Sequence, residues 1–353
     1  MNAASLPASY RAMALVQAAE HRLQPVERPM APLAPGELRL RVHACGVCRT
    51  DLHIVDGELP TTTLPRVPGH EIVGTVVELG PGCRRMRVGE RIGVPWLHAA
   101  CEHCSHCVSG HENLCEAASF TGWSVDGGYA QYAVAREDYS FALPANYSDE
   151  EAAPLLCAGL IGYRALRLLP AASVVGLYGF GAAGHLIAQV ALAQGRRVFA
   201  FTRRGDAAAQ ALARSLGVAW AGDSQHAPPR PMDGAILFAP AGELVPIALE
   251  HVSPGGTVVC AGIHMSDIPS FPYRLLWKER CLRSVANLTR RDGQEFLAFA
   301  ATHTLQLSTT AYSLEQANAA LDDLRAGRVT GAAVLRCLDA GGSSSSGYRR
   351  SPV

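Results

Sequence analysis

Four cysteines lie close together in the sequence Cys101-x2-Cys104-x2-Cys107-x7-Cys115. Four thiolates at this spacing can surround one Zn²⁺ ion in a tetrahedron and leave no coordination position free. A closed site of this kind stabilises a loop and carries out no reaction. Disulfide bonds and an iron–sulfur cluster are the alternatives. Cysteines so close in sequence pair poorly as disulfides, and the other motifs of the chain favour zinc.

A glycine motif, Gly179-Phe-Gly181-Ala182-Ala183-Gly184, follows an apolar run and opens a helical pattern. In a strand–turn–helix unit the first glycine permits a tight turn and the second lets the backbone approach a pyrophosphate. The third lets the helix pack on the strand. The helix N-terminus adds N–H donors for the phosphates. The motif therefore predicts a dinucleotide site, and a plain glycine turn is the alternative.

The end of the next predicted strand bears on the choice of nicotinamide cofactor. An NAD site typically has an acidic residue there, which binds the ribose 2′-hydroxyl. This chain has Thr202, Arg203 and Arg204 instead. One hydroxyl and two guanidinium groups can hold a 2′-phosphate. We therefore expect NADP(H) to be favoured, and NAD(H) is the alternative if both arginines are solvated surface groups.

Three further motifs contain residues for a second metal site. A catalytic zinc usually has three protein ligands and one free position. The motifs are Cys48-Arg-Thr50-Asp51-Leu-His53, Pro68-Gly-His70-Glu71 and Leu156-Cys157-Ala-Gly159. They lie far apart in the sequence, so spacing alone does not unite them. Taken singly, Cys157 is more typical of a buried core thiol and His70 of a histidine in a turn.

In order and combination, these motifs closely resemble those of the zinc-dependent alcohol dehydrogenases of the medium-chain dehydrogenase/reductase superfamily. The likeness extends over about residues 37–335 and includes Asp126-Gly-Gly-Tyr-Ala-Gln-Tyr132. It implies hydride transfer between a nicotinamide cofactor and a primary or small secondary alcohol, or the aldehyde or ketone in reverse. It also implies two Zn²⁺ ions per chain and a homodimer or homotetramer.

The resemblance assigns the second metal site residue by residue. Cys48, His70 and Cys157 match the three ligands of the catalytic zinc. Glu71 matches a nearby carboxylate that can take the open position when no substrate is bound. Asp51 matches the carboxylate that fixes the tautomer of the ligand histidine, as such outer carboxylates commonly do.

The resemblance also implies a proton path and a substrate pocket. Thr50 matches the hydroxyl that takes the alcohol proton, and His53 matches the group that passes it to solvent. A histidine suits that task because its pKa of roughly 6.5 lies near working pH. Leu59, Trp96 and Trp123 match positions of the apolar pocket, and ordinary core packing is the alternative for all three.

Two positions depart from the family pattern. Ile161 stands where many members have a threonine that contacts the nicotinamide. Ala332 stands near the place where relatives have an arginine for the pyrophosphate. Arg290 or Arg291 is our hypothesis for a replacement. Neither departure affects the expected metal ligands.

The pattern of residue types along the chain predicts the helices and strands that position these residues. Residues 1–157 contain short β-branched runs typical of a mostly β domain, which the resemblance makes GroES-like. Residues 158–293 alternate strand and helix, which predicts a doubly wound parallel sheet of the Rossmann type. Residues 294–340 return to the first domain, and the Gly/Ser-rich segment 341–353 is expected to be disordered. The fold class is therefore α/β.

Composition limits the classes of partner. The chain has 353 residues, 48% of them hydrophobic and 18% charged, with formal net charge +0. This balance gives no electrostatic reason to expect nucleic acid or an acidic membrane as partner. Eleven cysteines and no recognisable signal peptide favour a cytoplasmic protein. A non-catalytic zinc and nucleotide redox sensor and a quinone or enone reductase are the alternative functions.

Overall fold

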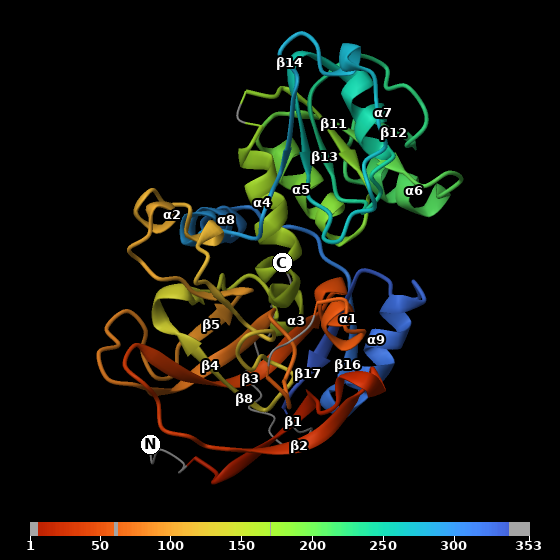
Figure 1. Cartoon of the computed structure of the whole chain (residues 1–353). Coiled ribbons are helices and arrows are strands. Elements are labelled where there is room, and N and C mark those ends of the chain that lie inside the picture. Colours follow the sequence, from red (N-terminus) through yellow and green to blue (C-terminus); the bar gives the residue numbers. More distant parts are fainter. Residues whose placement is uncertain (1–5, 60–62, 170, 339–353) are drawn as a thin grey trace, which may run out of the picture.

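The computed structural model describes residues 6–59, 63–169 and 171–338. The chain forms two parts, one above the other in Figure 1, which we call the parallel-sheet part and the β part. The expected disordered segment, 341–353, lies outside the described residues. Within the described ranges, no helix is both long and apolar enough to cross a membrane.

The parallel-sheet part is built on six strands in the order β12-β11-β10-β13-β14-β15. This is the order of a dinucleotide-binding sheet, in which the chain starts at the centre and winds outward in both directions. All five residues of β10 are buried, as expected for a strand covered on both faces. The predicted doubly wound parallel sheet is therefore confirmed. Its strands are β10 (Val174–Tyr178), β11 (Arg197–Thr202), β12 (Trp220–Asp223), β13 (Met232–Leu237), β14 (Val252–Cys260) and β15 (Cys281–Ser284).

Helices alternate with these strands and pack on the sheet. Helix α5 begins directly after the glycine turn, and Asp206 caps α6 by accepting a hydrogen bond from the N–H of Ala209 at 3.0 Å. Helix α4 connects the two parts (Figure 1). The four helices are α4 (Ala158–Arg167), α5 (Ala182–Ala193), α6 (Ala207–Ser215) and α7 (Leu244–His251).

The β part contains a seven-stranded sheet in the order β16-β17-β3-β4-β5-β9, with β8 paired to β3. Its long central strand β3 is largely buried and ends at the first metal motif. The strands of this sheet are β3 (Glu37–Val47), β4 (Ile72–Leu79), β5 (Arg91–Val94), β8 (Tyr132–Arg136), β9 (Phe141–Ala142), β16 (Thr309–Ser313) and β17 (Ala332–Arg336). Two smaller sheets pair β1 (Ser9–Leu15) with β2 (Leu23–Pro29) and β6 (Leu97–Ala99) with β7 (Ser119–Phe120).

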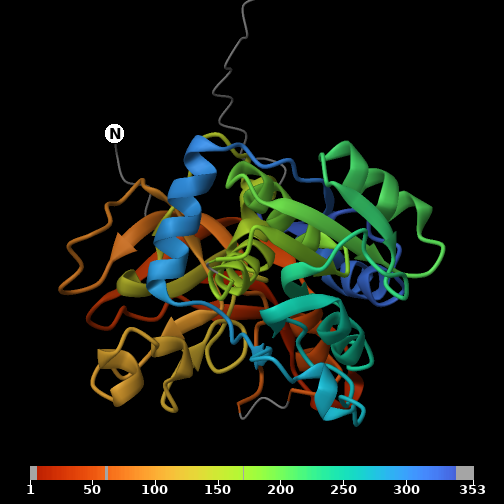
Figure 2. The same cartoon turned by 90° about the horizontal axis from the view of Figure 1, so that it is seen from above.

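The C-terminal segment returns to the β part, where β17 pairs with β3 antiparallel. Helix α8 lies along one side of the molecule in the turned view (Figure 2). The remaining helices are α1 (Arg49–Val55), α2 (Ser105–Val108), α3 (Asp149–Ala152), α8 (Arg290–Thr302) and α9 (Ala317–Arg325). Short 3-10 turns occur at Ala18–Glu20, Glu112–Leu114, Glu137–Tyr139, Ala153–Leu156, Tyr273–Leu275 and Leu314–Gln316.

One continuous apolar core joins the two parts. It contains residues of the β part, such as Leu97 and Phe141, together with Leu177 and Val259 of the parallel sheet. The residues around Cys157, at the start of α4, belong to this core as well. Because the core is continuous, the metal motifs of the β part are held at a fixed place beside the carboxyl ends of the parallel strands.

Candidate metal centres and nucleotide cavity

Three remote segments bring four ligand-type side chains to one place. Cys48 caps the start of α1, His70 and Glu71 precede β4, and Cys157 stands at the start of α4. One ligand atom from each of these residues lies within 4.8 Å of all the others. The fold therefore unites motifs that spacing alone did not.

The environment of His70 decides which ring nitrogen faces the cluster. Its Nε2 lies 3.3 Å from Cys48 Sγ, while its Nδ1 lies 3.4 Å from Asp51 Oδ1. Asp51 is completely buried and accepts hydrogen bonds from the backbone N–H groups of Cys48 at 2.9 Å and Gly69 at 3.1 Å. The carboxylate is thus fixed behind the ring, and Nε2 is the nitrogen that can bind an ion.

The titratable groups of this cluster shift one another's pKa values. Hydrogen bonding to Cys157 and the nearby His70 lower the pKa of the Cys48 thiol despite its burial. The hydrogen bond to Cys48, together with burial, raises the pKa of Cys157. Burial, added to the charge of Cys48, raises the pKa of Glu71. Burial disfavours the charged form of His70, but Cys48 and Asp51 outweigh it and raise its pKa.

This donor set fits a divalent zinc ion. Two sulfurs and one imidazole are ligands that Zn²⁺ prefers, and a carboxylate stands beside them at a fourth position. Several acids buried at one spot cannot all ionise unless a cation balances them. A bound Zn²⁺ supplies that balance, so the cluster has the properties of an open metal site.

The four-cysteine segment forms the second cluster, with ligand atoms also within 4.8 Å of one another. The Sγ atoms of Cys104 and Cys107 are 3.5 Å apart and those of Cys101 and Cys107 are 3.9 Å apart, so these thiols are not bonded as disulfides. Backbone N–H groups of His103 and Cys104 lower the pKa of Cys101 to about 6. The arrangement fits a closed tetrahedral zinc site, which Cys115 completes.

Helix α1 carries the predicted proton path. Thr50 is buried, and its backbone N–H donates to Cys48 Sγ at 3.3 Å. His53 stands one turn later, and its Nδ1 contacts the carboxylate of Glu58. Sequence reasoning missed Glu58, because a glutamate five residues after a histidine is no recognisable motif. Leu59 follows directly, and its N–H donates to the carbonyl oxygen of His53 at 2.8 Å.

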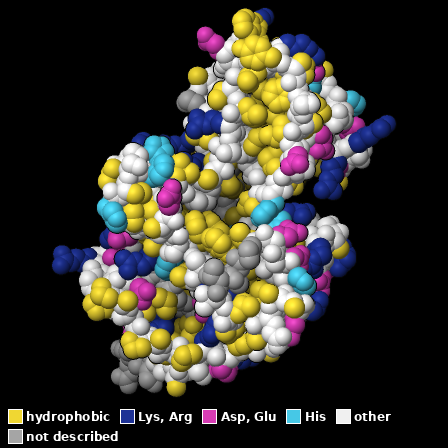
Figure 3. All heavy atoms as spheres, viewed as in Figure 1, with side chains coloured by type: hydrophobic (Ala, Val, Ile, Leu, Met, Phe, Trp, Pro, Cys, Tyr) yellow, Lys and Arg dark blue, Asp and Glu magenta, His cyan; other side chains and the backbone are white. Residues whose placement is uncertain are grey.

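An aromatic wall stands beside His70. Trp96 meets the His70 ring edge-on, with centroids 5.0 Å apart, and stacks on Trp123 with centroids 6.2 Å apart. Phe120 also stacks on Trp96, at 5.2 Å, and lies 5.6 Å from Trp123. Sequence reasoning missed Phe120. A hollow between the two parts, with hydrophobic side chains at its floor, is visible in Figure 3.

A cavity of about 650 Å³ lies over the glycine turn. Gly179 adopts φ +94°, which favours glycine, and a Cβ at Gly184 would stand 2.3 Å from the carbonyl oxygen of Gly179. Nothing lies within 4 Å of a Cβ placed on Gly181, so the backbone there faces open space. The cavity is also lined by Ala182 and Ala183. These properties are those of a phosphate-binding turn.

The far end of this cavity contains only part of the predicted 2′-phosphate site. Thr202 and Arg203 line it, whereas Arg204 is not among its lining residues. The Thr202 hydroxyl accepts a hydrogen bond from Gln210 Nε2 at 3.0 Å, and the same amide donates to Asp223 at 3.0 Å. Arg203 has no ion-pair partner among the described residues, so its charge is available to a ligand.

Arg49 is the functional candidate that sequence reasoning missed in this cavity. It lines the space above the glycine turn, although it belongs to α1 of the β part. Arg49 and His53 are four residues apart and therefore share one face of the helix. The signal was present in the sequence, since Arg49 directly follows Cys48 in the first metal motif.

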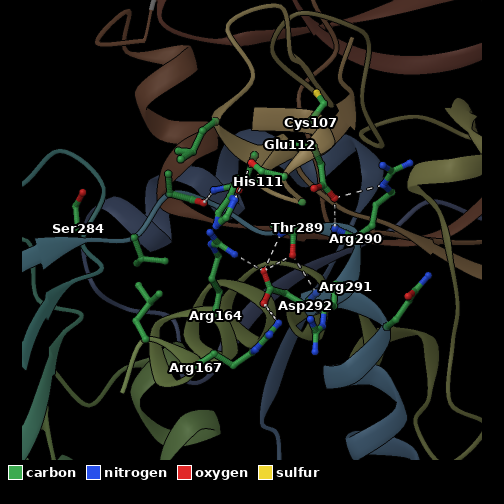
Figure 4. A pocket seen from close by; sticks show the side chains of 18 of the residues that line it. Cys107, His111, Glu112, Arg164, Arg167, Ser284, Thr289, Arg290, Arg291 and Asp292 are labelled. Carbon is green, nitrogen blue, oxygen red and sulfur yellow. Dashed lines mark hydrogen bonds and ion pairs between the residues drawn. The ribbon is translucent and has the colours of Figure 1, made fainter. Parts of the chain in front are cut away.

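The structure does not support Arg290 or Arg291 as pyrophosphate ligands. Both line a different cavity, of about 760 Å³, between the four-cysteine segment and α8 (Figure 4). Arg290 pairs with Glu102 at 2.9 Å and with Glu112 at 3.3 Å. Arg291 pairs with Glu295 at 2.6 Å. Our hypothesis was wrong because the pairs of Arg290 join the four-cysteine segment to α8, and the pair of Arg291 lies within α8 itself.

Comparisons with known proteins agree with this geometry. The family described as alcohol dehydrogenase GroES-like domain matches residues 34–145. A Mycobacterium tuberculosis protein described as "Probable alcohol dehydrogenase AdhA" is 49% identical over 310 residues, which cover 86% of this chain and 89% of the relative. An alcohol dehydrogenase of Geobacillus stearothermophilus is 37% identical over 327 residues, covering 89% of this chain and 96% of the relative.

Solved structures show the same fold over nearly the whole chain. A cobalt- and zinc-bound thermostable alcohol dehydrogenase from Pyrobaculum aerophilum has a TM-score of 0.83 and 25% identity, and the match covers 93% of this chain and 99% of that one. Acetophenone reductase from Geotrichum candidum, in complex with NAD, has a TM-score of 0.84 and 26% identity, with 94% and 98% covered. The predicted combination of a GroES-like domain and a Rossmann sheet is confirmed.

Proposed function

The chain belongs to the zinc-containing medium-chain alcohol dehydrogenases, which use a nicotinamide cofactor, and we propose that its substrates are primary or small secondary alcohols. The aldehyde or ketone is the substrate of the reverse reaction. The observation that carries this proposal is the cluster of Cys48, His70 and Cys157 beside Glu71. Helix α1 connects this cluster to the nucleotide cavity, since Arg49 follows Cys48 and lines that cavity.

Each group has a proposed task. Cys48, His70 and Cys157 would hold the catalytic zinc, Glu71 is the nearby carboxylate that could take the open position when no substrate is bound, and Asp51 would fix the His70 ring. When bound, Zn²⁺ acts as a Lewis acid on the alcohol or carbonyl oxygen, and the nicotinamide accepts or returns the hydride. Cys101, Cys104, Cys107 and Cys115 hold the structural zinc.

The protein's own residues move the proton. The Thr50 hydroxyl takes the proton of the alcohol, and His53 passes it to solvent. Burial of Thr50 and partial exposure of His53 support this direction, because the path starts in the interior and ends at the rim. The aromatic wall of Trp96, Phe120 and Trp123 excludes water from the reacting atoms. Leu59 is our proposed fourth pocket residue.

NADP(H) is the cofactor we propose, with NAD(H) as the alternative. The support is Arg203, which lines the cavity without a carboxylate partner among the described residues. Arg204 does not line the cavity, so the proposal now rests on one arginine. Replacing Arg203 by Ala should lower catalytic efficiency with NADP about tenfold or more and leave that with NAD nearly unchanged. Equal effects on both cofactors would reject this proposal, and Arg204→Ala is the matched control.

Arg49 is our proposed pyrophosphate ligand. It lies over the glycine turn, where Gly179, Gly181 and Gly184 bring the backbone close to the phosphates. It supplies the positive charge that Ala332 cannot give. This assignment replaces the hypothesis about the two arginines of α8.

The test of the function is absorbance of the reduced nicotinamide with alcohols of increasing chain length and with both cofactors. Turnover by the zinc-loaded enzyme and loss of turnover in Cys48→Ala, with folding and cofactor binding retained, are expected. Cys45→Ala is a matched control, because Cys45 is a buried core thiol outside the cluster. No turnover with any alcohol or aldehyde at full metal loading would favour the alternative, a zinc and nucleotide redox sensor.

The assembly and location also remain proposals. We propose a homodimer or homotetramer formed across the parallel-sheet part, because β15 ends the sheet and is mostly exposed. Light scattering of the purified enzyme tests this assembly.

We propose that the chain divides into a catalytic domain of residues 1–157 and 294–340 and a nucleotide domain of residues 158–293. Eleven free cysteines support a cytoplasmic location.

A further inference from the structure

A ring contact joins the two parts of the molecule near the nucleotide cavity. The imidazole of His264, in the loop after β14, lies with its centroid 4.3 Å from that of His53, and the ring planes are tilted by 47°. His53 belongs to α1 of the β part, while His264 belongs to the parallel-sheet part. The contact therefore exists only while the two parts meet at this place.

The loop that carries His264 is attached to the wall of the nucleotide cavity. The Ser266 side chain accepts a hydrogen bond from the N–H of Gly242 at 2.8 Å, and the N–H of Ser266 donates to the carbonyl oxygen of Pro240 at 3.2 Å. A Cβ at Gly242 would stand 2.2 Å from the carbonyl oxygen of Asp267. Pro240 lines the cavity, so the segment that holds His264 in place is part of the wall that a nucleotide in this cavity would meet.

A second contact fixes His53 from its own segment. Its Nδ1 contacts the Glu58 carboxylate, so Nδ1 carries a proton and Nε2 is left to accept another. The side chain of Glu58 is 58% exposed and that of His53 17% exposed. An ion pair this exposed constrains a ring only weakly. The packing of His264 against the ring is therefore the stronger constraint on its orientation.

We propose that His264 is a positioning residue for proton release, an inference that rests on the proposed dehydrogenase function. Together with Glu58 it fixes the imidazole of His53 so that Nε2 meets the proton released from the alcohol through Thr50. The hydride and its electron pair go to the nicotinamide, and the proton goes to Nε2 and then to water. His264 neither gains nor loses a proton, since it acts by ring packing. The contact also makes proton release depend on a seated cofactor.

Two variants separate ring packing from other roles of His264. His264→Ala removes the ring, whereas His264→Phe retains a ring that has no nitrogen. Aromatic pairs typically stabilise by amounts equal to about a two- to twelvefold change in an equilibrium. We expect kcat for alcohol oxidation to fall by about that factor in His264→Ala, with KM for the alcohol unchanged. His264→Phe should return kcat to within about twofold of the wild type.

The second measurement is the tautomer of His53 in the zinc-loaded protein, observed by NMR of ¹⁵N-labelled histidine. His53→Gln identifies the signal. We expect the Nδ1–H form to dominate in the wild type and in His264→Phe once NADP⁺ is added. In His264→Ala both tautomers should be populated, and in Glu58→Ala the fraction of the Nδ1–H form should fall but not vanish, because the packing of His264 remains.

Three results would overturn this inference: unchanged kcat in His264→Ala, a kcat in His264→Phe as low as in His264→Ala, or one His53 spectrum in all variants. Melting temperatures of the variants check that the fold is intact. Failure of the proposed function is distinguishable from failure of this inference. In that case the wild type itself would show no turnover, while the tautomer of His53 could still be measured by NMR.

Discussion

Asp51→Asn tests the geometry of the proposed catalytic zinc site most directly. The carboxylate of Asp51 is completely buried, and each of its oxygens has a fixed partner. Oδ2 accepts the N–H of Cys48 at 2.9 Å, and Oδ1 accepts the N–H of Gly69 at 3.1 Å while facing His70 Nδ1 at 3.4 Å. An asparagine keeps the volume but offers one oxygen and one NH₂ group.

Both ends of the side chain face N–H groups, so the NH₂ group of the asparagine must point at another donor at one of them. If its oxygen stays with Cys48, its NH₂ meets the N–H groups of Gly69 and His70. Leaving buried donors unsatisfied costs about 1–3 kcal/mol. Loss of such a carboxylate behind a ligand histidine typically weakens metal binding about 10–100-fold, or about 1.4–2.7 kcal/mol. We expect an effect of this size on one of the two zinc ions.

The assay is competition with a chromophoric chelator, which reports zinc release from each site. The chelator should remove one zinc ion of the wild type easily and the other with difficulty. Asp51→Asn should lower the zinc affinity of one site only. Asp56→Asn is the matched control. Asp56 follows the same helix but is not part of the cluster, and it pairs with Arg325 at 2.6 Å. Equal zinc affinity of Asp51→Asn and the wild type would refute the proposed role, and equal weakening of both ions would indicate unfolding instead.

Two further predictions concern stability. Cys104→Ala should lose the structural zinc and lower the melting temperature, whereas Cys83→Ala, outside both clusters, should not; a stable and fully active Cys104→Ala would contradict the structural role. Burial alone would raise the pKa of Asp292, but hydrogen bonds, including that from Arg164, outweigh it and lower it. Asp292→Asn should therefore cost about 3 kcal/mol of unfolding free energy at neutral pH, because Arg164 and Arg167 lose a buried partner. Since the folded pKa is depressed, the difference from the wild type should be complete above about pH 4–5 and shrink as pH falls further, which unfolding curves measure; a pH-independent difference would contradict it.

The fold could be predicted because its signals are local and repeated. The strand–glycine turn–helix of residues 174–193 and the alternation that follows predict a parallel sheet, and the strand order confirms it. The thiol pattern predicts a cluster because four ligands lie within one short loop. In both cases, residues that act together are close in sequence. The predicted sites that needed three remote segments came from family resemblance instead.

The features that sequence reasoning missed depend on contacts between distant segments. Phe120 joins the aromatic wall through β7, which pairs with β6 next to Trp96. His264 meets His53 across the two parts of the molecule. Arg290 was assigned wrongly because an unpaired arginine and one bound to Glu112 look alike in sequence. The partner of a charged side chain is a property of the fold, which no local pattern reveals.

Helix α1 explains why the first metal motif was nevertheless readable. Cys48 is its N-cap residue, and its sulfur accepts the N–H of Thr50, a task that Ser, Thr or Asp usually performs. Asp51 completes the capping box by accepting the N–H of Cys48. The same two side chains are the proposed zinc ligand and the support of His70. Because helix start and metal site share their residues, neither can change without the other, and the spacing of Cys48, Thr50 and Asp51 is fixed by backbone geometry before any metal is considered.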